Sequence, residues 1–258
     1  MYLTWLDNNS WLMEIGGQRI LVDPWLVGEL SFGLDWLFKA SLKQERLISE
    51  DIDLILLSQG LPDHAHLPTL KQLDHKIPVV ASPNAAKVVQ DLGYISVTCL
   101  EHGESFTLNN QVEIRALPGS PIGPTLTENS YLLKELATNF SLYYEPHGYH
   151  SPQLKQFAPV DVIITPTVDL ALPLVGAIIR GTNSALEVSK WLEPQFILPT
   201  AAKADAIYEG LMVNFLKAVG TAEDLRASLE KNNLTTQVLE PKPGDRLKLA
   251  LKKRAVTC

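Results

Sequence analysis

The chain has 258 residues, of which 46% are hydrophobic and 20% charged, close to the averages for globular proteins, so disordered, coiled-coil and membrane classes are excluded. Its 22 Lys and Arg against 29 Asp and Glu give a net charge of −7, which offers no long-range attraction to nucleic acid or anionic lipid. No stretch approaches the ~20 apolar residues that a membrane span needs.

Cysteine usage and the chain ends give further expectations. Cys99 and Cys258 are the two cysteines in the sequence and provide no disulfide framework. Together with a start that lacks a leader-like segment, this favours a reducing, cytoplasmic location. The basic residues at 252–254 are expected to be a solvated end. We find no internal repeat and no linker, so we expect one domain over residues 1–258.

The beginning of the chain predicts three antiparallel strands. They are expected at residues 3–6, 10–15 and 19–22. Gly16 and Gly17 separate the last two strands, because glycine adopts the positive φ that a tight hairpin turn needs. Asp23 and Pro24 end the third strand. Residues 25–43 are rich in Leu, Phe and Trp and contain two glycines, so we expect a long loop or short helix packing across the sheet.

From residue 53 onward, strands and helices alternate around a β-rich middle. Strands are expected at 53–57, 78–81, 97–100, 105–108, 112–117, 130–134, 141–144, 160–165, 195–199, 237–239 and 246–251. Helices are expected at 68–73, 83–92, 182–192, within 210–219, and at 222–232. Because strands interleave with helices at both ends, the sequence predicts an α/β fold whose sheets are covered by helices on the outside.

Two loops that directly follow apolar strands contain four of the six histidines. The first loop, residues 58–66, contains Asp63, His64 and His66. A carboxylate with two imidazoles suits coordination of Zn²⁺ through N and O atoms, or polarisation of water. An equally supported alternative is that Asp63 caps a helix beginning near His64 while the imidazoles form local hydrogen bonds.

The second loop, residues 143–150, presents Glu145 and His147 at the end of another strand. If the two loops converge, these two residues join Asp63 and His64 in a four-ligand shell. The alternative is that the Glu-His pair forms a structural hydrogen bond. Candidate ligands are therefore present in both loops, and their convergence decides between the two interpretations.

The N-terminal segments carry a family resemblance. Residues 5–14 and 19–25, with Asp-Pro after the third strand, resemble the start of metallo-β-lactamase-fold hydrolases of the UlaG-like type. Residues 58–64 fall where that family carries its His-x-His-x-Asp-His signature, and the resemblance extends to Pro199. It implies a four-layer αββα sandwich and metal-dependent hydrolysis.

The signature is degenerate in this chain. Gln59 and Leu61 replace its two leading histidines, and Asp63 and His64 are the residues that match. The family's next histidine falls near residues 119–121, where there is none. The resemblance therefore implies that the first metal site is lost.

Later family positions also differ here. The family's bridging Asp falls on Pro146 or His147, and its final His falls on Thr200, so His147 is the substitute ligand that the resemblance suggests. The sequences of these loops are similar to those of a protein subgroup that is found in photosynthetic organisms and described as metal-dependent-hydrolase-like. Within that likeness, the Gly/Pro-rich residues 119–124 with Glu128 and Asn129 line the same pocket, or simply form a tight loop.

Two functions follow as expectations. In the first, one divalent metal, Zn²⁺ or alternatively Mn²⁺ or Fe²⁺, is held by Asp63, His64 and His147, with Glu145 or His66 completing the shell. Asp63 and Gln59 are the candidate catalytic residues, with Gln59 orienting a water that attacks an ester, amide, lactone or phosphoester of a small molecule.

In the second, the protein is a catalytically inactive binder of a small polar ligand, and the same acids and imidazoles form a hydrogen-bonded network without metal. Loss of most signature ligands is what relaxed catalysis would leave. The oligomeric state is left open by the sequence, and fold resemblance alone does not choose the substrate.

Overall fold

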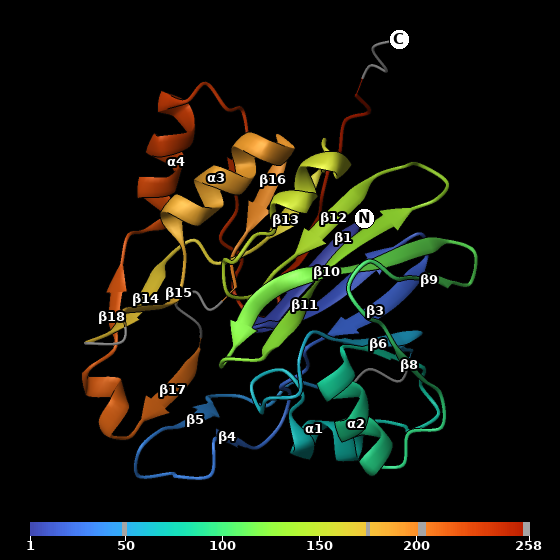
Figure 1. Cartoon of the computed structure of the whole chain (residues 1–258), viewed down its shortest axis with the longest axis vertical. Helices are drawn as coiled ribbons and strands as arrows, with labels where there is room; N and C mark the ends of the chain where they lie inside the picture. The colour runs from blue at the N-terminus through green and yellow to red at the C-terminus, as the bar shows by residue number, and fades with distance from the viewer. Residues whose placement is uncertain (48–50, 174–175, 201–204, 255–258) are drawn as a thin grey trace.

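A computed structural model describes residues 1–47, 51–173, 176–200 and 205–254 (Figure 1). Two seven-stranded sheets face each other, and helices cover their outer faces. Of the two cysteines, Cys99 is exposed and free, whereas Cys258 lies outside the described residues. Within the described ranges, no helix is long and apolar enough to cross a membrane.

The first sheet has the strand order β20-β1-β2-β3-β6-β7-β8. Its strands are β1 (Tyr2–Asp7), β2 (Ser10–Ile15), β3 (Gln18–Val22), β6 (Leu54–Leu57), β7 (Val79–Ala81), β8 (Val97–Cys99) and β20 (Arg246–Lys248). Strands β1 to β3 form the expected antiparallel start, and β3, β6, β7 and β8 run parallel. Gly16 and Gly17 make the β2–β3 turn with φ of 57° and 75°, as the sequence predicted.

The second sheet has the strand order β19-β16-β13-β12-β11-β10-β9. Its strands are β9 (Ser105–Leu108), β10 (Val112–Ile122), β11 (Leu126–Glu135), β12 (Ser141–Tyr144), β13 (Val162–Ile164), β16 (Phe196–Leu198) and β19 (Gln237–Val238). The β10–β11 hairpin extends further than expected, so most of the predicted tight loop at 119–124 belongs to a strand. A register irregularity between Pro118 and Pro121 marks the place where the prolines interrupt regular pairing.

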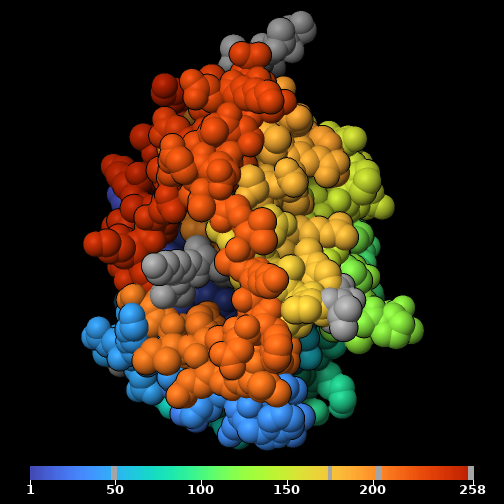
Figure 2. Space-filling model, turned by 90° about the vertical axis from the view of Figure 1, so that its left-hand side faces the viewer, coloured from blue at the N-terminus to red at the C-terminus, as the bar shows by residue number. Residues whose placement is uncertain are grey.

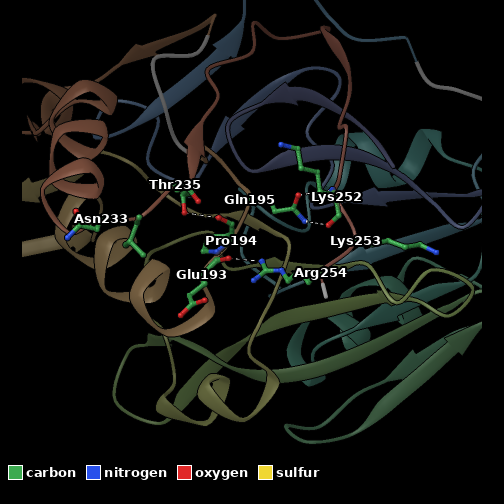
Figure 3. A pocket seen from close by; sticks show the side chains of 10 residues that line it. Glu193, Pro194, Gln195, Asn233, Thr235, Lys252, Lys253 and Arg254 are labelled. Atoms are coloured by element: carbon green, nitrogen blue, oxygen red, sulfur yellow. Dashed lines mark hydrogen bonds between the residues drawn. The ribbon is translucent and has the colours of Figure 1, made fainter. Parts of the chain in front are cut away.

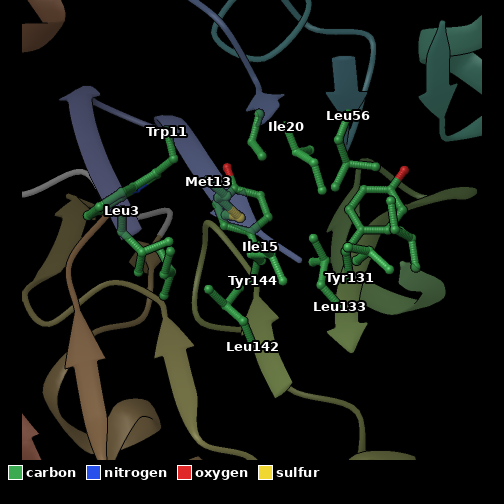
Figure 4. Packing of buried hydrophobic residues seen from close by; sticks show 14 of the residues in the cluster. Leu3, Trp11, Met13, Ile15, Ile20, Leu56, Tyr131, Leu133, Leu142 and Tyr144 are labelled. Carbon is green, nitrogen blue, oxygen red and sulfur yellow. The ribbon is translucent and has the colours of Figure 1, made fainter. Parts of the chain in front are cut away.

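Three buried clusters define the four layers. One fills the space between the sheets, where Trp11, Met13 and Ile20 of the first sheet pack near Leu133 and Leu142 of the second (Figure 4). A second cluster joins the first sheet to its helices, and a third joins the second sheet to its own. Each fully buried large apolar side chain contributes about 1.5–3 kcal/mol. The predicted αββα sandwich is confirmed.

The helices lie on the outer faces as expected. They are α1 (Leu67–Gln72), α2 (Pro83–Asp91), α3 (Thr182–Leu192) and α4 (Ala222–Lys231), with the 3₁₀ helix η1 (Pro152–Phe157) beside α3. Helix α2 turns Ala85, Ala86 and Val89 toward the first sheet, a spacing that places all three on one helical face.

Two small sheets correct two expectations. They contain β4 (Glu29–Ser31), β5 (Lys39–Leu42) and β17 (Ala206–Glu209) in one sheet, and β14 (Asp169–Leu172), β15 (Gly176–Ile179) and β18 (Lys217–Val219) in the other. Part of residues 25–43, expected as a loop or short helix, forms the antiparallel strands β4 and β5, and β17 pairs with β5. In Figure 2, orange atoms of the later part of the chain lie against blue atoms of its early part at the bottom of the molecule. The helix expected within 210–219 is instead the 3₁₀ helix η2 (Leu211–Asn214) followed by β18.

Candidate metal centre

The carboxyl ends of strands from both sheets meet at one edge of the sandwich. Asp23 follows β3, Ser58 follows β6 and Glu145 follows β12. The Tyr131 hydroxyl of β11 donates a hydrogen bond to the backbone oxygen of Leu57 at 2.8 Å, which ties the two sheets together here. The two histidine-bearing loops therefore converge, although they follow strands of facing sheets.

Asp23 anchors this edge. Its Oδ1 accepts the Ser58 backbone N–H at 2.8 Å, and its Oδ2 accepts the Ser58 hydroxyl at 2.6 Å and the Tyr144 hydroxyl at 2.7 Å. The same Oδ2 lies 2.8 Å from Nδ1 of His64. Asp23 is fully buried, and a buried carboxylate is tolerated when donors surround it in this way. With Nδ1 held by Asp23, the other imidazole nitrogen of His64, Nε2, lies 3.2 Å from Oδ2 of Asp63 and 3.3 Å from the Asn9 amide nitrogen.

Asp63, His64 and His147 form one candidate ligand set. One ligand atom from each lies within 4.8 Å of the others, and the two imidazole centroids are 5.0 Å apart. Nε2 of His64 lies 3.2 Å from Oδ2 of Asp63. Spacings of this size leave room for one cation between the donor atoms, because N and O ligands lie about 2.0–2.2 Å from Zn²⁺.

Charges within this set hold it together when no cation is bound. Burial by itself lowers the pKa of His64, but the carboxylates of Asp63 and Asp23 outweigh burial and raise this pKa well above its ordinary value. Burial likewise raises the pKa of Asp63, but His64 and His147 outweigh it and lower this pKa overall. A proton on His64 therefore partly offsets the buried acids, and a cation would take its place at Nε2.

Gly148 fixes the loop that presents His147. Its φ is +79°, and a Cβ added there would lie 1.7 Å from the Arg180 backbone oxygen. The Arg180 N–H donates to the His147 backbone oxygen at 2.8 Å, so the two segments run in direct contact. Glycine is required at this position on both counts, and the close approach sets where the His147 imidazole lies.

Glu128 of β11 lies behind His147. Its two carboxylate oxygens are 2.8 and 3.1 Å from Nδ1 of His147, and Oε2 accepts the Gln59 amide at 2.9 Å. The Ser120 backbone N–H donates to Oε1 at 3.1 Å. Burial raises the pKa of the fully buried Glu128, but the nearby His147 imidazole outweighs burial and lowers it. A carboxylate thus backs each imidazole of the set, as in carboxylate–histidine–metal arrangements.

Glu145 adds a further carboxyl to the cluster. It is fully buried, and its Oε2 accepts the backbone N–H groups of Gly148 and Tyr149, the latter at 2.8 Å. Burial and the neighbouring Glu128 carboxylate raise the pKa of Glu145 well above its ordinary value. Glu128, Glu145 and His147 form a second set whose ligand atoms also lie within 4.8 Å of one another.

Unpaired acceptor atoms test whether a cation fits. Oε1 of Gln59, Oδ1 of Asp63 and Oε1 of Glu145 are buried without a hydrogen-bond partner within the described ranges. The Gln59 and Asp63 oxygens are acceptors, whereas the raised pKa of Glu145 favours a protonated carboxyl beside Glu128 until a cation displaces the proton. Native proteins rarely leave buried polar atoms unsatisfied, and a cation in the cluster would satisfy oxygens of this kind. The residues present therefore fit a divalent cation with N and O ligands.

His66 takes the local role that the sequence left open. Its Nδ1 accepts the Thr69 N–H at 3.4 Å as the N-cap of α1, and lies 3.0 Å from the Thr69 hydroxyl. Its Nε2 lies 3.0 Å from the Glu29 backbone oxygen. Both nitrogens are engaged elsewhere, so His66 belongs to neither ligand set. The expected four-ligand shell divides in two: Asp63, His64 and His147 form one set, whereas Glu145 joins His147 and Glu128 in the other, with Gln59 against Glu128.

The structure also shows what sequence reasoning missed. Asp23 was seen as the end of a strand and Glu128 as pocket lining, yet each supports one imidazole. The Asp-Pro pair directly after β3 was the available signal for Asp23. The family's final His position, Thr200, lies beside the second loop, because its hydroxyl donates to the Pro146 backbone oxygen at 3.0 Å.

A separate pocket of about 450 Å³ lies at the other end of β16 (Figure 3). Its lining includes Glu193, Gln195 and Arg254, and Gln195 comes directly before β16 whereas Thr200 follows it. The Arg254 guanidinium is committed to the backbone oxygens of Val160 and Glu193. No candidate metal-ligand set of the described residues falls here, so the chemistry concentrates at the opposite edge.

The fold and the site define a class of αββα proteins. Two facing mixed sheets lie between helices, and acids and imidazoles form a site at the edge where the strands have their carboxyl ends. Within that class, the chain belongs to the beta-lactamase superfamily, whose domain model matches residues 2–201. The family predicted from the sequence is thereby confirmed, while its UlaG-like subtype stays a prediction.

Individual relatives agree with this assignment. A metal-dependent hydrolase from Herpetosiphon aurantiacus is 26% identical over 94% of this chain and 95% of its own length. An isothiocyanate hydrolase from Delia radicum gut bacteria has a TM-score of 0.70 at 15% identity, covering 96% of this chain and 99% of that one. A metallo hydrolase from Ignicoccus hospitalis has a TM-score of 0.69 at 14% identity over 97% and 99% of the two chains. The two solved structures share the fold.

Proposed function

We propose that this protein is a metal-dependent hydrolase that uses one divalent cation held by Asp63, His64 and His147. The observation that carries the proposal is the convergence of these three ligands beside buried acceptor oxygens that have no donor among the described residues. The name of the Herpetosiphon aurantiacus relative supports the same activity. The Glu145 and Gln59 oxygens lie in the cluster as additional candidate ligands.

The residues around the proposed ligands favour coordination through Nε2 of both imidazoles. Nδ1 of His64 lies against Asp23 and Nδ1 of His147 against Glu128, so each Nδ1 carries the proton that its carboxylate accepts. The ring orientation and tautomer of both ligands are then set before a cation arrives. N and O donors of this kind suit Zn²⁺, with Mn²⁺ and Fe²⁺ as alternatives.

A bound divalent cation would lower the pKa of a coordinated water from about 15.7 toward about 7 and polarise a carbonyl or phosphoryl oxygen. Asp63 and His147 retain 20% and 15% side-chain exposure whereas His64 has none, so substrate would approach from the Asp63 and His147 side. We propose that Oε1 of Gln59, which has no hydrogen-bond partner among the described residues, orients this water. The bond classes that match are esters, amides, lactones and phosphoesters of small molecules.

Metal analysis of protein purified without chelator tests the proposal. For the wild type we expect about one equivalent of metal and a lower melting temperature after EDTA treatment. In Asp63→Ala we expect no bound metal and no effect of EDTA on the melting temperature. A free metal concentration of 100 times the dissociation constant stabilises a protein by about 2.7 kcal/mol, which for a chain of this length shifts the melting temperature by several degrees. Asp91→Ala, an exposed carboxylate at the end of α2, is the matched control and should match the wild type.

The opposite outcome identifies the alternative function. Substoichiometric metal together with an unchanged melting temperature in EDTA would contradict the hydrolase proposal. The cluster would then serve as a metal-free, hydrogen-bonded binder of a small polar ligand.

A further inference from the structure

Glu128 joins separate segments of the chain at this edge. Its carboxylate accepts from Gln59 in the loop after β6, from the Ser120 backbone in β10, and from His147 in the loop after β12. Its backbone oxygen lies 3.2 Å from Nε2 of His102. One fully buried side chain therefore connects three elements that come from both sheets.

The hydrogen bonds leave Glu128 little capacity for a cation. A carboxylate has about four lone-pair sites, and Gln59, Ser120 and His147 already occupy three of them. The carboxyl of Glu145 lies against the remaining side, where each acid affects the pKa of the other. Within that set, the Glu128 carboxylate is satisfied by protein donors, whereas Oε1 of Glu145 and Oδ1 of Asp63 have no hydrogen-bond partner among the described residues.

We infer that Glu128 is a positioning residue that stands in for a metal ion, clamping the two histidine-bearing loops together and directing Nε2 of His147 toward Asp63 and His64. Its donor Gln59 occupies a position where the family resemblance places an imidazole of the first metal site, and the backbone donor Ser120 lies in the segment 119–121 near which the resemblance places another. The clamp accounts for a centre with one cation. This inference deepens the proposed function and rests on it for the identity of the ligand set.

The backbone of Gly119 packs so closely against the Glu128 side chain that a substitution at Gly119 can test the role of Glu128. A Cβ added at Gly119 would lie 2.9 Å from Cγ of Glu128 and 3.1 Å from the Ser130 backbone nitrogen. Gly119→Ala would therefore displace the Glu128 side chain without removing any polar group. It serves as a second variant if Glu128→Gln folds poorly.

The test uses the full chain, with Glu128→Gln and Gly119→Ala compared with wild type, and Glu135→Gln at the far end of β11 as matched control. The first measurement is the ¹⁵N spectrum of the histidines in metal-free protein. We expect wild type and the control to show His147 protonated at Nδ1, and both test variants to show a mixed population. The second is titration with Zn²⁺ against a competing chelator, where we expect one equivalent throughout and a 10–100-fold weaker affinity in the test variants.

Two results would overturn the inference. If wild type binds two cations and Glu128→Gln binds one, Glu128 is itself a ligand of a second metal. If both test variants keep the wild-type His147 spectrum and Zn²⁺ affinity, Glu128 positions nothing. Should wild type bind no Zn²⁺, the proposed hydrolase function fails, yet the histidine spectra of the metal-free variants still decide the role of Glu128.

Discussion

Asp23→Asn isolates the role of a single carboxylate oxygen. Oδ2 of Asp23 receives the Ser58 hydroxyl, the Tyr144 hydroxyl and the His64 imidazole, and in the variant an amide NH₂ can replace it. The two hydroxyls can turn and accept, and Tyr144 also has the Asn9 backbone oxygen at 3.0 Å. The imidazole can satisfy the amide only by giving up its Nδ1 proton. His64 would then carry its proton on Nε2, the atom proposed to bind metal.

The magnitude follows from these contacts. A hydrogen bond to a charged group contributes about 1.5–3 kcal/mol, so loss of the charged bond to His64 with partial loss of the others should cost about 3 kcal/mol. For a chain of this length that is a decrease of about 6–12 °C in melting temperature. Zn²⁺ affinity should fall about 10–100-fold, because the tautomer of a ligand is no longer fixed. Asp23 has a φ of 40°, which Asn tolerates, so backbone strain does not contribute.

Thermal melting of metal-free protein and chelator competition with Zn²⁺ measure the two effects separately. Asp53→Asn is the matched control, since its Oδ2 accepts the Arg19 backbone N–H at 2.7 Å at the opposite end of β6. It should lose about 1 kcal/mol of stability and bind Zn²⁺ like wild type. Wild-type Zn²⁺ affinity in Asp23→Asn would refute the argument that Asp23 sets the His64 tautomer.

Three further changes separate local roles from metal binding. His66→Ala should lower the free energy of unfolding, measured with urea, by about 1–2 kcal/mol, because α1 loses its N-cap. It should bind Zn²⁺ with wild-type affinity, and weaker binding would show that His66 is a metal ligand. Gly148→Ala should lower the free energy of unfolding by about 2–5 kcal/mol, because it adds left-handed strain and a clash with the Arg180 backbone. Gly17→Ala, which has a similar φ and open space around it, should lower it by about 1 kcal/mol. Equal losses would contradict the close-approach argument. Burial lowers the pKa of His150 in the folded protein to about 3. Below about pH 6.5 the unfolded chain therefore binds a proton at this imidazole that the folded chain does not, so the free energy of unfolding falls as pH decreases, by at most about 1.4 kcal/mol per pH unit. His150→Gln should flatten this slope between pH 6.5 and 5 in urea unfolding, and an unchanged slope would assign the effect elsewhere.

Local patterns predicted the layers of the fold well. The glycine pair at 16–17, the strand-ending Asp23 and the apolar run at 54–57 act through near neighbours, so the sequence displays them directly. The expectations that failed depend on distant partners. Residues 39–42 become a strand because 206–209 pair with them, and no periodicity within either segment reveals that pairing.

The candidate site was predicted in part for the same reason. Convergence of the two loops was an expectation drawn from strand ends, and the structure brings Asp63, His64 and His147 into one candidate ligand set, whereas Glu145 falls in a second set with Glu128 and His147. Glu128 could not be placed, because its approach to Gln59 depends on how far the β10–β11 hairpin extends and on its irregular register. The single domain, the cytoplasmic location, the small-molecule substrate and the absence of nucleic-acid or membrane partners stay predictions.

The edge at which the two sheets meet also bears on how the protein folds. Tyr144 donates to the Asn9 backbone across 135 positions of sequence, and Gln59 to Glu128 across 69. Contacts this distant form only after long loops close, which slows folding and postpones such contacts until the halves have docked. A cation would then find its ligands assembled late, so metal would secure the finished sandwich rather than nucleate it.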